Sequence, residues 1–271
     1  MRPADRRAGI SRAPGDMKSA GETISILHRD EHYIVVDKPA GVLVHRTAVD
    51  AREPRCLLQT LRDQIDRRVH PVHRLDKGTS GIIVFALHPG AANRLACAFR
   101  EERVDKLYLA VVRGYAPERV VVDWPLRDTI DTPSRRRSAT LRPAVTDVRC
   151  LARAELSTPV GRYATARYSL VACRPRSGRQ HQIRRHLKHL RHPVIGDANY
   201  GDLAHNRFFR NTLGVGRLLL AAIQICFQHP YTNTALRIAA PLDESFRRVL
   251  QEFGWRTPVD AQGAVWPGVE C

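Results

Sequence analysis

The spacing of apolar side chains along the 271-residue chain predicts several buried strands. Residues 24–27 and 33–36 are short β-branched runs on either side of a polar turn, which predicts a hairpin. Residues 81–87 form an unbroken apolar run, and residues 106–113 are apolar on both strand faces, so we expect both segments to be buried. Further strand patterns lie at residues 163–173, 218–227 and 235–239.

Helical spacing of apolar residues predicts helices at residues 56–65 and 180–190, a third beginning at Pro89, and a fourth capped by Asp243 and ending near residue 253. Strands and helices are interspersed without the regular alternation of a doubly wound sheet, which favours the α+β class. We expect one domain over residues 23–256, a flexible basic tail at 1–22 and a second tail at 257–271.

The charge composition of the chain indicates a binding partner. The chain carries 44 Lys and Arg against 27 Asp and Glu, a net charge of +17, which predicts binding to nucleic acid. No apolar run approaches the roughly 18 residues of a membrane span, and the first twenty residues lack the apolar centre of a secretory signal. The six cysteines are scattered without a CxxC pair, which is typical of reduced thiols in a cytoplasmic protein.

Two segments are unusually basic. Residues 129–145 are polar, contain the run Arg135 to Arg137, and are interpreted as a solvent-exposed insertion. Residues 176–191 hold six Lys and Arg, three His and no acid. On a helix their cations could follow a phosphate backbone or could simply face solvent. A zinc site at His186, His189 and His192 is a third reading, disfavoured by the neighbouring cations and by the lack of a nearby carboxylate or thiolate.

The loop before the apolar run at 81–87 contains a candidate catalytic acidic residue, Asp76. Asp76 lies between Arg74 and Lys77, and these cations favour its ionised form, which could act as a nucleophile or base. Local residues equally allow an Asp that pairs with its neighbours or caps a turn. The loop is not a Walker-type phosphate cradle, because Lys77 precedes the glycines, and Ser80 does not lie in a GxSxG elbow.

Five motifs occur in an order and spacing that resemble a known family. They are HRLD with TSG at 73–81, KLYLAVVRG at 106–114, GRQHQIRRH at 178–186, HPVIGDANYG at 192–201 and RLLLAA at 217–222. Together they resemble the pseudouridine synthases of the RluA type, over about residues 24–255. Segments 58–65, 143–152 and 201–208 are similar to the tRNA-acting member of that family.

The resemblance implies a bent, mixed, mainly antiparallel sheet flanked by helices, with a central active-site cleft. It implies an enzyme that needs no cofactor and that isomerises a uridine to pseudouridine in structured RNA. Independently of the resemblance, we expect a monomer that binds neither a metal nor a membrane. The RNA would be tRNA, in the acceptor or T-stem region, with ribosomal RNA as the alternative. A catalytically silent RNA-binding factor is the competing class, and the joint presence of Asp76, Tyr108 and Arg184 argues against it.

The resemblance also implies roles for individual residues. Asp76 would be the nucleophile, Tyr108 would stack on the flipped base, and Arg184 would pair with Asp76 and hold it ionised. Arg74 would replace the extruded uridine in the RNA stack, and Leu219 would form the apolar wall of the pocket. The resemblance further suggests RNA contacts for a set of residues in the basic helix region: Arg179, His181, Arg185 and Lys188.

Overall fold

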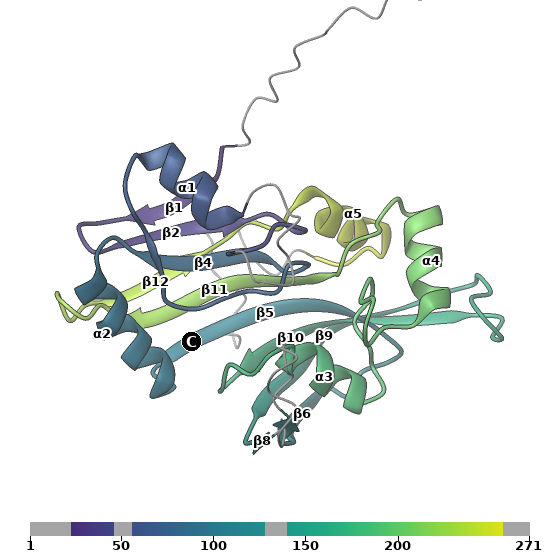
Figure 1. Ribbon diagram of the computed structural model, residues 1–271. Helices are drawn as coiled ribbons and strands as arrows, with labels where there is room; N and C mark the ends of the chain where they lie inside the picture. Colours follow the sequence, from purple (N-terminus) through teal and green to yellow (C-terminus); the bar gives the residue numbers. More distant parts are fainter. Residues whose placement is uncertain (1–22, 46–55, 128–139, 257–271) are drawn as a thin grey trace, which may run out of the picture.

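A single twisted sheet organises the molecule in the computed structural model, which describes residues 23–45, 56–127 and 140–256. Its strands follow the order β1-β2-β4-β11-β5-β10-β9-β6, with β12 paired to β11 and β3 paired to β4. Within the described ranges the pairing of β11 with β4 is parallel and the other pairings are antiparallel. The expected mixed, mainly antiparallel α+β architecture is confirmed (Figure 1).

The strands are β1 Ser25–Arg29, β2 Tyr33–Lys38, β3 His70–Pro71, β4 Ser80–Ala86, β5 Val104–Arg113, β6 Arg119–Asp123, β7 Leu126–Arg127, β8 Leu141–Arg142, β9 Val145–Leu156, β10 Ala166–Pro175, β11 Leu220–Gln228 and β12 Ala235–Ala239. The helices are α1 Leu57–Ile65, α2 Pro89–Arg100, α3 Gln182–His189, α4 Leu203–Thr212 and α5 Glu244–Glu252.

Helices α2, α4 and α5 begin at side-chain caps. Pro89 occupies the first turn of α2, and the His88 ring accepts a hydrogen bond from the Ala91 amide at 3.3 Å. The Asp243 carboxylate accepts from the Phe246 amide at the start of α5, as expected from the sequence. No helix within the described residues is long and apolar enough to cross a bilayer.

The core is divided between the two faces of the sheet, as the pattern along β5 predicts. Leu107, Leu109 and Val111 pack in one cluster with α4 and α5, through Phe209 and Phe246 among others. The alternate residues of β5 face a second cluster that holds α3 in place. Its members include Ala110, Val112, Ile183 and Leu187. Helices α2 and α1 pack on opposite faces of β4 in the same way (Figure 1).

Strands β6 and β9 and helix α4 were not expected from the sequence. Charged and apolar residues alternate along part of β9, and its pairing with β6 and β10 stabilises the extended backbone. The interpretation of 129–145 as an insertion is therefore wrong at its end, because Leu141–Arg142 pairs with Leu126–Arg127 and β9 begins at Val145. Residues 128–139 with Arg135 to Arg137, and both expected tails, lie outside the described residues.

Candidate active site

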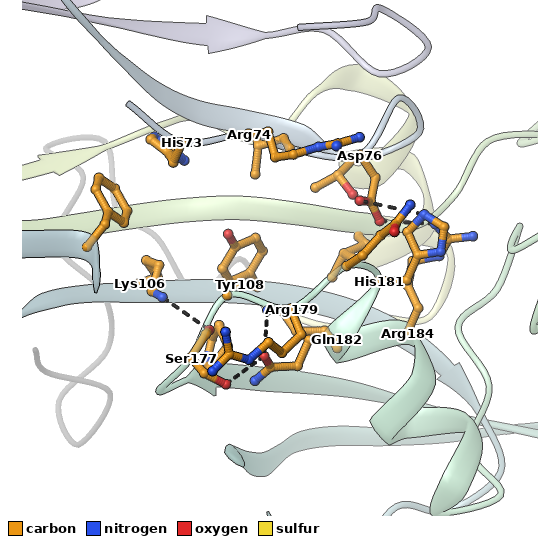
Figure 2. A pocket seen from close by; sticks show the side chains of 18 of the residues that line it. His73, Arg74, Asp76, Lys106, Tyr108, Ser177, Arg179, His181, Gln182 and Arg184 are labelled. Carbon is orange, nitrogen blue, oxygen red and sulfur yellow. Dashed lines mark hydrogen bonds and ion pairs between the residues drawn. The ribbon is translucent and has the colours of Figure 1, made fainter. Parts of the chain in front are cut away.

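A cavity of about 530 Å³ lies over the middle of the sheet (Figure 2). The loop that leads into β4 forms one wall, and residues 175–184, which lead into α3, form the opposite wall. Its floor is made by Lys106 and Tyr108 of β5 and Leu220 of β11, and the C-terminal turns of α2 close one end. The expected central cleft is thus present, and it gathers residues from four of the five sequence motifs.

Asp76 and Arg184 meet at one end of this cavity, although 108 positions separate them in the sequence. Arg184 Nη1 donates to Asp76 Oδ2 at 3.0 Å, so the contact expected between them is present. The opposite edge of the guanidinium is held by Asp197, which accepts from Nε at 2.7 Å and from Nη2 at 2.8 Å. Asp197 is fully buried, whereas the Asp76 side chain keeps 19% exposure toward the cavity. One guanidinium therefore bridges a buried carboxylate and an accessible one.

The charges of this cluster stabilise each other. Burial alone would raise the pKa of Asp197, but the hydrogen bonds and charge of Arg184 and the amides of Asn199 and Tyr200 hold that pKa below its ordinary value. Burial would lower the pKa of Arg184, but Asp197 and Asp76 raise it instead. The guanidinium stays charged and fixed by a bidentate contact, so it presents a constant positive group to Asp76.

His181 completes this end of the cavity, and Tyr200 contacts its ring. His181 precedes α3 in the left-handed conformation, with φ of 54°, which turns its ring toward Asp76. Its Nε2 lies 3.9 Å from Asp76 Oδ1, and its Nδ1 lies 3.2 Å from the Tyr200 hydroxyl. Burial lowers the pKa of His181, partly offset by the Asp76 charge. A neutral imidazole at pH 7 can exchange hydrogen bonds with a ligand without adding charge.

Tyr108 lies on the floor between the two walls (Figure 2). Burial raises the pKa of its phenol, and the Asp76 carboxylate raises that pKa further. The hydroxyl therefore keeps its proton at neutral pH, and Tyr108 offers an apolar ring face and a hydrogen-bond donor rather than a phenolate.

The loop carrying Asp76 is anchored from below by a buried lysine. Lys38 Nζ donates to the carbonyls of Pro39, Val42 and Lys77 at 2.7 to 3.1 Å, and its side chain is fully buried. The Gly41 amide also donates to the Lys77 carbonyl at 2.8 Å. Burial lowers the pKa of Lys38 to about 7. The turn after β2, which the sequence marked only as a hairpin end, thus fixes the residue next to Asp76.

The expected RNA contacts divide into two groups. Arg74 is exposed and lines the cavity, and Arg179 lines it while donating from Nε to the Pro143 carbonyl at 3.1 Å. Arg185 and Lys188 do not line the cavity. Arg185 donates to the Arg127 carbonyl at 2.9 Å, and Lys188 is exposed on α3. Any contact of these two with RNA would have to be made outside the cavity.

The assignment of Leu219 to the pocket wall is wrong. Leu219 is fully buried in the cluster that includes Phe209 and Phe246, on the sheet face opposite the cavity. Its neighbour Leu220 lines the cavity instead. Successive side chains of an extended segment point to opposite faces, so an error of one position moves the side chain through the sheet.

The histidines of the basic helix are engaged by the protein. His186 Nδ1 lies 2.9 Å from Thr146 Oγ1, and Nε2 lies 3.0 Å from the Trp124 carbonyl. His189 packs its ring against Trp124, and His192 Nδ1 contacts the Arg113 carbonyl. Within the described residues no group of His, Cys, Asp and Glu could hold a metal ion. The three histidines therefore do not converge on a common point.

Asp197 and Lys38 are the polar residues that sequence reasoning missed. Asp197 stands inside the HPVIGDANYG motif, and the glycine before it, Gly196, is the signal that the sequence offers. In the structure a Cβ at Gly196 would lie 1.8 Å from the Arg217 carbonyl oxygen. That close approach fixes the backbone beside Asp197.

Comparison with known proteins agrees with this arrangement. A family model described as RNA pseudouridylate synthase matches residues 32–189. The tRNA pseudouridine synthase C of Vibrio cholerae is 44% identical over 86% of this chain and 97% of its own length, and that of Salmonella typhi is 45% identical over 86% and 91%. The solved human RNA pseudouridylate synthase domain containing 4 is 26% identical, with a TM-score of 0.67 over 86% of this chain and 94% of that one. The identity extends over nearly all of the described fold, and this chain belongs to the RNA pseudouridylate synthase family.

Proposed function

We propose that this enzyme converts a specific uridine of tRNA to pseudouridine, with Asp76 as the nucleophile. The observation that carries the proposal is the position of Asp76: an accessible carboxylate at the end of a cavity, paired with an arginine that a buried second carboxylate holds in place. Relatives of 41% to 45% identity that carry the name tRNA pseudouridine synthase C support tRNA as the substrate.

The reaction begins with extrusion of the uridine, because its reacting atoms cannot be reached inside a paired stem. Arg74, exposed at the cavity, fills the place that the base leaves in the stack. The flipped base enters the cavity over the floor, where it meets Tyr108 and Leu220, and Leu220 takes the role expected of Leu219. Arg179 and His181 line the same cavity and can donate hydrogen bonds to the nucleotide.

Asp76 then attacks the bound nucleotide, at C6 of the ring or C1′ of the ribose. The bond between N1 and C1′ breaks, the base turns, and C5 bonds to C1′. The proton on C5 is lost and one proton is taken up at N1, which restores the ring, and release of Asp76 regenerates the carboxylate. Arg184 stabilises the charge that returns to Asp76, and no electrons leave or enter the system, so the chemistry needs no cofactor.

The substrate is identified by mapping pseudouridines in tRNA and ribosomal RNA from cells that lack the gene. Loss of one pseudouridine in the acceptor or T-stem region of tRNA is the expected result. A missing pseudouridine confined to ribosomal RNA would overturn the tRNA assignment and leave the activity standing. Monomeric state and a cytoplasmic location belong to the same proposal, and light scattering of the purified enzyme tests the first.

The nucleophile is tested by Asp76→Asn, which keeps the shape of the side chain and removes its negative charge. We expect release of tritium from C5-labelled uridine in tRNA to fall to background while tRNA binding survives. Turnover of Asp76→Asn at the rate of the unmodified enzyme would contradict the assignment of Asp76 as the nucleophile. Asp147→Asn is the matched control, because Asp147 pairs with Arg176 on the exposed surface outside the cavity.

A further inference from the structure

The cavity continues beyond the groups that the proposed reaction uses. Asp76, His181 and Arg184 gather on one side of Tyr108, and His73 and Lys106 lie on its other side (Figure 2). Phe99, near the end of α2, lines this second half. None of these three residues has a role in the proposed chemistry, so the second half of the cavity is free to bind another part of the substrate.

Within the described residues, Lys106 brings a positive charge without a close carboxylate partner into this second half. Its Nζ donates to the Ser177 carbonyl at 3.3 Å, a long contact, and it forms no ion pair with a carboxylate among the described residues. Burial lowers the pKa of Lys106, while the more distant charges of Glu102 and Asp105 raise it. Glu102 is exposed at the cavity edge, so it supports the lysine charge without covering it. A half-buried cation that lacks a close carboxylate partner suits an anionic ligand.

His73 adds a neutral hydrogen-bond donor beside this cation. The Val84 amide donates to His73 Nε2 at 2.9 Å, so the ring proton sits on Nδ1, and Nδ1 has no hydrogen-bond partner among the described residues. Burial, helped by the charge of Lys106, lowers the pKa of His73 to about 3, so the ring stays neutral at physiological pH. Phe99 stacks on the imidazole with ring centroids 4.6 Å apart, which fixes the ring plane.

We propose that this half of the cavity is a subsite for the phosphodiester that links the target uridine to its neighbour, held by Lys106 Nζ and His73 Nδ1. The subsite rests on the proposed function, since it takes Tyr108 as the floor of the uridine site. Lys106 lies two residues before Tyr108 on the same face of β5, about 7 Å along the strand. That distance matches one nucleotide step of an extended RNA chain, so the subsite contacts the RNA backbone beside the flipped base and not the base itself.

The test combines a protein change with an RNA change. Synthetic RNA hairpins carry the target uridine, with a single uncharged methylphosphonate on its 5′ or its 3′ side, and their dissociation constants are measured with Asp76→Asn so that no turnover occurs. Lys106→Met should weaken binding of the unmodified hairpin about 10- to 100-fold, the range for a charge-assisted hydrogen bond. One of the two methylphosphonates should weaken binding by a similar factor.

The decisive measurement is the combination. If Lys106 contacts that phosphate, Lys106→Met should bind the sensitive methylphosphonate hairpin no more weakly than it binds the unmodified one, to within about threefold. The subsite would be overturned if the affinity loss from Lys106→Met multiplied with the loss from the methylphosphonate, whether that group lies on the 5′ or the 3′ side of the uridine. Lys106→Arg should keep most of the affinity, and the RNA change alone tests the phosphate in a protein whose fold is untouched. Arg62→Met, on the exposed side of α1 outside the cavity, is the control. Any loss of affinity that it causes should be the same for the unmodified hairpin and for either methylphosphonate hairpin.

The same experiment separates the two proposals. Failure of the unmodified enzyme to convert any uridine would remove the proposed function first. Normal conversion together with multiplied losses for Lys106→Met would remove the subsite and leave the function intact.

Discussion

Arg184 serves two carboxylates with different tasks. Its Nε and Nη2 are committed to the buried Asp197, and only Nη1 reaches Asp76. A carboxylate bound on one oxygen keeps lone pairs free for chemistry, whereas a bidentate pair is held rigidly. The division lets Arg184 orient the proposed nucleophile while leaving part of its carboxylate accessible. In this proposal Asp197 is a positioning residue that acts through Arg184.

Replacing Asp197 with Asn tests this positioning role. We expect a loss of about 1 to 3 kcal/mol in the free energy of unfolding, because a charged hydrogen-bond pair is broken in a buried site while Asp76 still compensates Arg184. Turnover at saturating tRNA should fall more than tRNA affinity, since the substrate does not touch Asp197. The exposed pair between Asp147 and Arg176 is the control, and Asp147→Asn should change stability by less than about 1 kcal/mol.

The Asp197 contribution should depend on pH. Its pKa in the folded protein lies below the ordinary value of 3.8, so its contribution is fully present above that value and is lost as the pH falls through the folded pKa. Denaturant unfolding of both proteins should show a constant difference from pH 7 to 5 that closes in stronger acid. A difference that is unchanged at pH 3 or below would contradict an electrostatic role for Asp197.

At the scale of elements, the site depends on close packing between the strands that carry it. Gly81 is the second residue of β4, pairs with Ala222 of the parallel strand β11, and has a φ of +102°. A Cβ at this position would lie 2.0 Å from the Ala222 carbonyl oxygen. The loop carrying Asp76 enters the sheet at this point, so the side chain of any other residue would push that loop away from β11.

Gly81→Ala should destabilise the protein by about 3 kcal/mol or more, because a backbone clash adds to the strain of a positive φ. Gly41→Ala is the matched comparison: its φ of +85° is similar, but nothing lies within 4 Å of the added Cβ. It should lose only about 1 kcal/mol. Thermal unfolding followed by circular dichroism measures both, and equal losses would show that the clash relaxes without cost.

At the scale of the whole molecule, the net charge of +17 attracts RNA, which is a polyanion. Five of these cations line the cavity, namely Arg74, Arg100, Lys106, Arg179 and Arg184, and Lys188 is exposed on α3 beyond it. Each contact between a cation and a phosphate releases counterions, which makes binding depend on salt. The charge therefore contributes mainly to affinity, while the cavity contributes the choice of nucleotide.

The affinity for tRNA should fall steeply with salt, with a slope of about −0.7 to −0.9 in log Kassoc against log salt for each phosphate contacted. Lys188→Met should lower the steepness by about one contact if Lys188 binds backbone, with little change in the turnover of bound tRNA. Filter binding between about 50 and 200 mM salt measures the slope. A flat dependence would contradict binding dominated by phosphate contacts.

The sequence by itself determined the local elements and the order of the motifs. The apolar pattern of β5, with both faces buried, and the Asp243 cap of α5 follow from side-chain periodicity and local hydrogen bonding, which need no distant partner. The motifs led from Asp76, Tyr108 and Arg184 to the family. Strand β9 was missed, because charged residues interrupt its apolar ones and its extended form depends on pairing with β6 and β10.

Only the tertiary structure decided how these residues are joined. It brought Asp76 and Arg184 into contact across 108 positions, added Asp197 as the buried partner, and replaced Leu219 with Leu220 at the cavity wall. Such choices depend on strand register and on which buried groups face each other. A one-residue change of register reverses a side chain, and a pairing between distant segments leaves no periodic trace in the sequence.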